Sequence, residues 1–338
     1  MGTLQELRLG TRGSQLALWQ ANTVAARLAA AGGLRCRIVV IKTSGDRLAD
    51  APLSEVGGKR LFVKEIEEAL LGNEIDLAVH SSKDMPAVLP DGLAIAGVLP
   101  REDALDAVVL PTGPVSGFSR TAASVDELVA HFRQSPRIGT GSVRRVAQLS
   151  RIFPRARFVP IRGNLDTRLR KLDAGEYDAL ILAAAGLRRL GFASRISMAL
   201  PASACVPAPG QGTVAIETRE GDDAVGRLVA SFDDPAARAA LEAERALVAA
   251  LGGGCQTPIG ALASPLDEET IELVAVVVAL DGSRVVRGAA RGPRREAAAI
   301  GARVAAQLIA GGANEILTDA RSQPSTVISR QSAAMTDE

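Results

Sequence analysis

Short apolar runs and longer helix-like segments alternate along residues 7–80, and this alternation constrains the fold more than any other feature of the chain. Strands that alternate with helices build parallel sheets that are covered by the helices. The spacing predicts strands at 7–10, 36–42 and 75–80 and helices at 14–30 and 64–71. We therefore expect an α/β fold at the start of the chain.

The same alternation returns after residues 111–135, which are rich in Pro, Gly, Ser and Thr and predict a domain boundary. A Pro- and Gly-rich run at 201–212 predicts a second crossing between domains. The second set has strands at 137–139, 158–161 and 178–184 and helices at 142–152 and 165–172. A strand at 214–218 follows the second crossing.

The C-terminal part has a different pattern, with a long helix first and two strands next to each other. We expect the helix after Asp234 to reach Leu251, strands at 271–280 and 283–290, and a helix at 296–309, which together make a smaller α+β domain. The predicted domains are domain 1 at 1–112 and 212–232, domain 2 at 113–207, and domain 3 at 235–338.

The charge of the chain is balanced overall but not locally. With 39 basic and 38 acidic residues, no global field draws the protein onto nucleic acid or an anionic membrane. Residues 137–195, however, hold twelve Arg and one Lys against four acidic residues. This segment predicts a binding region for anions.

Several classes of protein are disfavoured by the sequence. The longest apolar stretches, such as 180–187, are far shorter than the roughly 20 residues that span a bilayer, and residues 1–10 do not resemble a secretory signal. His80 and His131 are too far apart for a zinc site, and the three cysteines are odd in number and widely spaced. We expect a cytoplasmic protein without a membrane span or a metal site.

Two turns share one pattern, LGTRGS at 9–14 and IGTGS at 138–142. Each leads from a strand into a helix, whose free N–H groups either bind an anion or are satisfied by N-capping. Arg144 and Arg145 follow the second turn, where the helix dipole disfavours positive charge, so a bound anion would relieve that cost. Neither turn has a nucleotide-binding glycine spacing, which favours carboxylate ligands.

Two side chains are candidates for chemistry. Asp84 follows the strand at 75–80 and lies where α/β folds place ligands, although an ion pair with Lys83 or a turn cap before Pro86 explains it equally well. Cys255 follows three glycines, which favour an accessible thiol. An incidental cysteine at a helix C-cap is the simpler interpretation of the residues alone.

Three arginines of the basic segment stand near predicted strand ends or a core stripe. Arg168 flanks the apolar stripe of the helix at 165–172, so we expect it to point inward and to need an anionic partner. Arg162 and Arg189 each come shortly after a predicted strand, where a solvated side chain is the alternative to a binding role.

Six motifs, in this order, resemble the porphobilinogen deaminase (hydroxymethylbilane synthase) family. They are HSSKDMP at 80–86, GTGSVRR at 139–145, RGNLDTRL at 162–169, AAGLRRLG at 184–191, PAPGQG at 207–212 and GCQTPIG at 254–260. The chain departs from the family pattern in a longer segment at 111–136, one more glycine before Cys255, and Arg60 in place of a commoner glycine.

The resemblance implies two α/β domains like those of periplasmic ligand-binding proteins and a third domain that carries the cofactor cysteine. It implies a monomer that joins four molecules of its small-molecule substrate, porphobilinogen, head to tail with loss of four ammonia. Cys255 would hold a dipyrromethane cofactor through a thioether, and Asp84 would be the catalytic carboxylate. Lys59 and Phe62 would belong to a loop over the cleft, and the carboxylates of cofactor and substrate would be bound by Arg12, Ser14, Lys83, Ser142, Arg144, Arg145, Arg162, Arg168 and Arg189.

Two other functions are compatible with part of the sequence. A two-lobed anion-binding receptor would explain the paired turns and the arginines, but it does not need Cys255 or a third domain. A nucleic-acid binder would use the basic segment, but the aromatic residues near it follow apolar strand and helix patterns and do not form stacking platforms.

Overall fold

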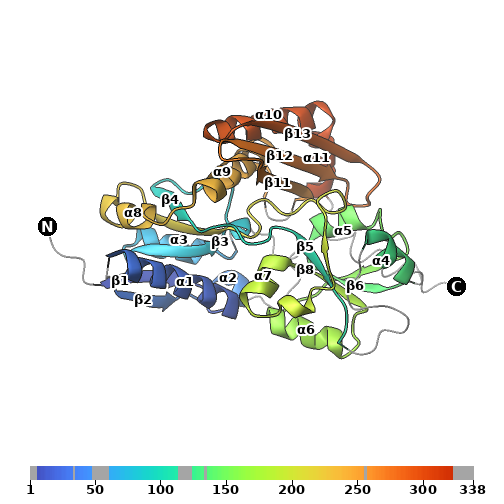
Figure 1. Cartoon of the computed structure of the whole chain (residues 1–338), viewed down its shortest axis with the longest axis horizontal. Helices are drawn as coiled ribbons and strands as arrows, with labels where there is room; N and C mark the ends of the chain where they lie inside the picture. Colours follow the sequence, from blue (N-terminus) through green and yellow to red (C-terminus); the bar gives the residue numbers. More distant parts are fainter. Residues whose placement is uncertain are drawn as a thin grey trace.

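The computed structural model describes residues 6–32, 35–47, 61–112, 124–132, 135–254 and 257–322. Three separate sheets with their own helices make up this part of the chain (Figure 1). Two are mixed five-stranded sheets in α/β lobes, and the third is a three-stranded antiparallel sheet packed against helices. The α/β class and the smaller C-terminal α+β domain are confirmed.

The first lobe combines the N-terminal part of the chain with one strand that returns much later. Its sheet has the order β2-β1-β3-β10-β4, with β10 antiparallel to both of its neighbours. The strands are β1 (Glu6–Thr11), β2 (Arg35–Val40), β3 (Leu77–Ser81), β4 (Leu93–Val98) and β10 (Val214–Arg219), and the helices are α1 (Gln15–Gly32), α2 (Ser44–Arg47), α3 (Lys64–Leu71), α8 (Asp223–Ala230) and the 3-10 turn η1 (Ser82–Asp84).

The second lobe repeats this topology. Its sheet has the order β7-β6-β8-β5-β9, so β6 and β8 occupy the places that β1 and β3 have in the first lobe. The strands are β5 (Asp106–Val109), β6 (Arg137–Gly139), β7 (Arg157–Val159), β8 (Ala179–Ala183) and β9 (Met198–Leu200), and the helices are α4 (Val125–His131), α5 (Val143–Leu149), α6 (Leu165–Asp173), α7 (Ala184–Arg189) and the 3-10 turn η2 (Ala193–Arg195).

The chain crosses between the lobes earlier than the sequence predicts. We expected residues up to 112 in the first domain, but β5 pairs with β8 and β9, so the first crossing lies before Asp106. The expectation of parallel sheets is also wrong at this point, because β5 and β10 run antiparallel to their neighbours. Each of these two strands enters its sheet directly after a crossing, and such long-range pairing leaves no mark on the local pattern.

The C-terminal unit is built on one long helix and an antiparallel sheet. Helix α9 (Pro235–Ala250) begins at Asp234, whose carboxylate accepts a hydrogen bond from Ala237 N at 2.7 Å, with proline in the first turn. Leu247 of α9 is buried in one cluster with residues of the sheet and of the next helix. The other elements are β11 (Ile259–Pro265), β12 (Thr270–Val278), β13 (Val285–Pro293), the 3-10 turn η3 (Arg294–Glu296), α10 (Ala297–Ala310) and α11 (Ala313–Ser322).

The helices and the metal-ligating side chains of the described ranges give no sign of a membrane span or a metal site. None of the helices there is long and apolar enough to cross a bilayer. In the same ranges, no cluster of three or more His, Cys, Asp or Glu side chains is arranged to hold a metal ion.

Candidate functional site

Asp84 ends a short 3-10 turn at the carboxyl end of β3. Ser82 N donates to Thr213 O at 3.0 Å and Met85 N donates to Ser82 O at 3.1 Å, which fixes the turn at both ends. Asp84 lines a cavity of about 70 Å³ together with Arg12 and Ser81. Asp84 therefore lies where the sequence predicts it, at the carboxyl end of a strand.

Arg12 reaches the same cavity from the turn after β1. Its guanidinium lies 2.5 Å from Asp46 Oδ1 and 4.3 Å from the ring centroid of Phe62. Burial raises the pKa of Asp46, but the hydrogen bond and the charge of Arg12 outweigh it and hold that pKa below its usual value. Ser14 and Phe62 line the cavity as well, so the first lobe brings together four of the predicted site residues: Arg12, Ser14, Phe62 and Asp84.

Both serines of the repeated turn pattern act as helix caps. Ser14 Oγ accepts a hydrogen bond from Ala17 N at 3.3 Å, and Ser142 Oγ accepts one from Arg145 N at 3.5 Å. Each cap satisfies one backbone donor and leaves the other free N–H groups of the first turn. Capping and anion binding are thus compatible at these two turns.

Arg144 and Arg145 are buried beneath the lobe boundary and share one carboxylate, Asp106. Arg144 Nη1 lies 2.7 Å from Asp106 Oδ2, and Arg145 Nη2 lies 2.7 Å from Asp106 Oδ1. Burial raises the pKa of Asp106, and the two guanidinium charges reverse that effect and hold it far below its usual value. The anion that relieves the positive charge at the start of α5 is therefore supplied by the chain itself. Asp106, which precedes an apolar run, was missed by the sequence analysis.

Cys205 and Gln211 complete this buried cluster. Cys205 Sγ lies 3.4 Å from Asp106 Oδ2, and Gln211 Nε2 donates to Asp106 Oδ1 at 2.9 Å. Burial raises the pKa of the Cys205 thiol to about 12, so this cysteine is a poor nucleophile. Both residues belong to the second crossing, which is thereby tied to the start of β5.

Lys83, next to Asp84, lies within electrostatic range of this cluster. Burial lowers the pKa of Lys83 to about 8, while the charge of Asp84 opposes that shift and the charge of Arg145 adds to it. The charges of basic residues of the second lobe therefore affect the pKa of Lys83, in the turn that carries Asp84.

Arg162 and Arg168 belong to the basic segment and lie just before and within the start of α6. Arg168 Nε donates to Gly163 O at 2.8 Å, and no carboxylate of the described residues pairs with either guanidinium. Burial, together with the charges of Arg145 and Arg162, lowers the pKa of Arg168 to about 10. Arg168 does point inward, as predicted, but its expected anionic partner is not among these residues.

Arg189 of α7 contacts the second crossing and α1. Its Nη2 donates to Gly212 O at 2.7 Å, and its guanidinium carbon lies 5.5 Å from the ring centroid of Trp19. Burial lowers the pKa of Arg189, and the charge of Glu102 opposes that shift. No acidic side chain of the described residues forms an ion pair with it.

Glu244 connects the C-terminal unit to this region. This fully buried carboxylate accepts hydrogen bonds from Gly210 N at 2.6 Å, Ala263 N at 2.7 Å and Arg101 Nη1 at 2.7 Å. Gly210 in turn packs on the Asp84 turn, because a Cβ added to it would lie 2.8 Å from Ser82 Oγ. Helix α9 is thus held at a fixed place relative to the turn.

Two predicted site residues, Cys255 and Lys59, lie outside the described residues. The residues on either side of the segment 255–256 are joined, since Thr257 Oγ1 donates to Gly254 O at 2.6 Å and Thr257 N donates to the same oxygen at 3.0 Å. His80, which we expected to be a satisfied core residue, is buried and lies 3.0 Å from Glu217 Oε2.

The residues of the site suit a ligand that carries several carboxylates. Guanidinium groups bind carboxylates through paired, charge-assisted hydrogen bonds, and Arg162, Arg168 and Arg189 have no acid of the described chain to bind. The hydroxyl of Ser82, buried beside Asp84, has no hydrogen-bond partner within the described ranges. One carboxylate among many cations can also stabilise a positive charge that develops on such a ligand.

Family models and curated relatives that match this chain carry one family name, and together they cover nearly all of it. A family model described as porphobilinogen deaminase, dipyromethane cofactor binding domain, matches residues 7–227, and one described as porphobilinogen deaminase, C-terminal domain, matches 239–310. Curated relatives named porphobilinogen deaminase include that of Geobacter metallireducens, 45% identical over 93% of this chain and 95% of its own, and that of Moorella thermoacetica, 43% identical over 94% and 97%.

Solved structures with some likeness to this chain include a periplasmic domain and a binding protein. The VFT2 domain of Bordetella pertussis BvgS has a TM-score of 0.37 and 16% identity, covering 67% of this chain and 86% of that one. The alkanesulfonate-binding protein SsuA of Xanthomonas axonopodis pv. citri has a TM-score of 0.37 and 15% identity, covering 73% and 75%. Scores of this size carry no information about ligand or activity.

Proposed function

The chain belongs to the porphobilinogen deaminase family, and we propose that it joins four porphobilinogen molecules head to tail, with release of four ammonia, to give hydroxymethylbilane. One observation carries this proposal: Asp84 and Arg12 meet at one cavity, in a chain that the family models cover almost from end to end. The enzyme therefore acts in tetrapyrrole biosynthesis, the route to haem-type pigments.

We propose that Cys255 carries a dipyrromethane cofactor through a thioether. The family model over residues 7–227 is described by the binding of this cofactor. When bound, the group supplies the pyrrole carbon to which the first substrate unit is joined. The acetate and propionate side chains of its pyrroles match Arg162, Arg168 and Arg189, for which the described residues provide no carboxylate.

Asp84 is the residue best placed to act on the reacting pyrrole. Loss of ammonia from porphobilinogen leaves a cationic methylene-pyrrole, which a nearby carboxylate stabilises by its charge. The same carboxylate can accept hydrogen bonds from pyrrole N–H groups. It can also carry the proton to the departing amine and remove the proton from the ring carbon after coupling.

The basic residues around Asp84 hold the substrate by its carboxylates. Arg12 is kept in place by Asp46 and by the ring of Phe62, and Ser14 and Ser142 cap the helices α1 and α5. Lys83 adds a cation next to Asp84. Arg144 and Arg145 contribute positive potential from beneath, because each keeps its contact to Asp106.

We also propose that the enzyme is a monomer that works in a reducing compartment, the cytoplasm, on porphobilinogen as its only partner. Cys36 and Cys205, the cysteines within the described ranges, are both free, as expected where thiols stay reduced. Size-exclusion chromatography with light scattering gives the mass of the species in solution. A mass of about 35.0 kDa supports the monomer, and twice that mass contradicts it.

The activity is tested by incubating the purified protein with porphobilinogen and counting both products. We expect four ammonia for each hydroxymethylbilane, and a rate lower by about a hundredfold or more in Asp84→Asn, which loses the charge but keeps the shape. Asp91→Asn, at an exposed aspartate of the same lobe, is the matched control. Binding of porphobilinogen without ammonia release would instead favour the anion-binding receptor.

A further inference from the structure

Trp19 is the one tryptophan of the chain, and its partly exposed side chain faces the second lobe. It projects from α1 of the first lobe, and the guanidinium that faces it belongs to Arg189 of α7 in the second lobe. The two helices approach closely here, since a Cβ added to Gly186 of α7 would lie 3.7 Å from Leu16 Cδ2 of α1. The contact is therefore part of the junction between lobes.

Arg189 also holds the second crossing. Its Nη2 donates to Gly212 O, an oxygen that accepts a further hydrogen bond from Glu102 N at 3.1 Å. Glu102 lies on the first crossing and Gly212 on the second, so the Arg189 side chain contacts α1 through Trp19 and the second crossing at the oxygen that also joins it to the first. A guanidinium has five N–H donors, and among the described residues Arg189 uses one.

An aromatic face is suited to hold a cation that must also bind a carboxylate. A carboxylate partner would occupy the donors of Arg189 and neutralise its charge, as Asp106 does for Arg145. The ring of Trp19 attracts the guanidinium by its quadrupole and leaves the N–H donors at the edge of the group unoccupied. It thus offsets part of the burial cost of Arg189 and keeps its binding capacity.

From this geometry we propose that Trp19 is a positioning residue, which holds Arg189 at the junction of the lobes ready for a carboxylate of the substrate chain. The inference rests on the proposed function, because it takes Arg189 as a carboxylate-binding residue of the deaminase. Trp19, on the first lobe, would thus act on the substrate only through Arg189, on the second lobe.

The kinetic test uses a double-mutant cycle on the full-length holoenzyme. We expect Trp19→Leu to raise the KM for porphobilinogen about fivefold and Trp19→Phe, which keeps an aromatic face, to raise it less. Arg189→Leu raises KM more than either. In the Arg189→Leu background, Trp19→Leu adds nothing, because its partner is already gone.

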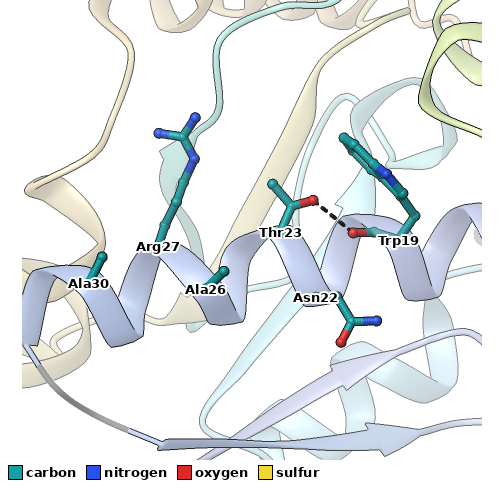
Figure 2. Close-up of a pocket in the computed structure, with 6 residues that line it drawn as sticks. All are labelled: Trp19, Asn22, Thr23, Ala26, Arg27 and Ala30. Atoms are coloured by element: carbon teal, nitrogen blue, oxygen red, sulfur yellow. Dashed lines mark hydrogen bonds between the residues drawn. The ribbon is translucent and has the colours of Figure 1, made fainter.

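Asn22→Ala is the control for the double-mutant cycle. Asn22 lines the same open groove on α1 as Trp19, but it projects to another side of the helix and donates to Leu18 O at 2.8 Å (Figure 2). We expect its KM to equal that of the wild type. A KM for Trp19→Leu equal to that of Asn22→Ala, or the same factor for Trp19→Leu in both backgrounds, overturns the inference.

Tryptophan fluorescence tests the contact without any turnover. Because Trp19 is the single tryptophan, the emission of the resting enzyme reports the charge that faces its ring. Arg189→Leu is expected to shift the emission maximum, and Asn22→Ala to leave it unchanged. Identical spectra for wild type and Arg189→Leu would contradict the contact.

Different results would refute the positioning role of Trp19, the carboxylate-binding role of Arg189 and the deaminase function. If Arg189→Leu raises KM and Trp19→Leu does not, the positioning role is wrong and the carboxylate role of Arg189 stands. If Arg189→Leu leaves KM unchanged, both are wrong. Absence of ammonia release from the wild type refutes the deaminase function, and the spectra then decide on the contact alone.

Discussion

Arg144 Nη1 lies 2.7 Å from Asp106 Oδ2, and both side chains are almost completely buried where the chain passes from the first lobe to the second. Arg145 binds the other oxygen of the same carboxylate. A buried carboxylate that serves two guanidinium groups leaves two uncompensated charges when it is removed. Asp106 is therefore central to the folding of the lobe boundary.

We predict that Asp106→Asn lowers the free energy of unfolding by about 3–5 kcal/mol. The amide keeps the size of the side chain but cannot neutralise Arg144 and Arg145. Urea denaturation followed by circular dichroism measures the change. Asp166→Asn, at an exposed aspartate of α6, is the control and should stay within about 0.5 kcal/mol of the wild type. Equal stability of the two variants would contradict the role of Asp106.

The same pair predicts how stability depends on pH. The pKa of Asp106 is depressed in the folded state, so its contribution is complete above the unfolded-state pKa and is lost as pH falls towards the folded-state pKa. The free energy of unfolding of the wild type should thus decrease from about pH 5 downwards, and less steeply for Asp106→Asn. Parallel pH profiles of the two proteins would show that Asp106 does not titrate differently on folding.

The lowered pKa of Lys83 leads us to expect a second pH dependence, this time of substrate binding. Its pKa is lowered to about 8, so the ammonium loses its charge as pH rises through that value. We expect the KM for porphobilinogen to rise between about pH 7.5 and 9 in the wild type, because a neutral amine no longer attracts carboxylates. Lys83→Arg, which stays charged, should remove this rise. A rise that persists in Lys83→Arg would have to come from another group.

Because Gly210 has a positive φ and packs closely on the Asp84 turn, we expect a side chain at this position to displace the turn. Gly210 has a φ of +74°, and an added Cβ would lie 2.8 Å from Ser82 Oγ and 3.0 Å from Lys83 N. Gly210→Ala should therefore destabilise the protein by about 1–3 kcal/mol and lower kcat by displacing the turn. Gly226→Ala, in open space on α8, should leave kcat unchanged and not lower the melting temperature. The proposed packing is wrong if Gly210→Ala keeps full activity.

Two neighbouring arginines of α6 test the basic segment. Arg168 is largely buried and has no carboxylate partner within the described part of the chain, and Arg170 is exposed on the same helix. Arg168→Leu should raise KM by about 10- to 100-fold, the value of one charge-assisted hydrogen bond, and Arg170→Leu should leave it within about twofold. Steady-state kinetics at constant ionic strength decides between them. Equal effects of the two variants would mean that only the total charge matters.

Local periodicity predicts single elements of this fold well. Helix α6 spans Leu165–Asp173 where the pattern indicates 165–172, and α9 spans Pro235–Ala250 where it indicates a helix that begins after residue 234 and reaches 251. Both have a continuous apolar face and clear ends, which are local properties of the sequence. Helix α4 (Val125–His131), in contrast, lies within a stretch that its Pro, Gly and Ser content made us read as a boundary.

Contacts between distant segments explain what the sequence analysis missed. β5 is four residues long, and its place between β8 and β9 depends on strands that lie far away in the chain. The partner of Arg144 and Arg145 was expected to be a ligand, because nothing near them in the sequence identifies Asp106. The sequence motifs identify the candidate residues themselves. The residues that contact them in the structure cannot be identified without the fold.

The most direct test of the account is the intact mass of the purified protein beside that of Cys255→Ser, with Cys36→Ser as a control at a half-buried thiol. We predict that the wild type and Cys36→Ser exceed their sequence masses by two deaminated pyrrole units, and that Cys255→Ser does not. A wild type that keeps its bare sequence mass after incubation with porphobilinogen would contradict the account.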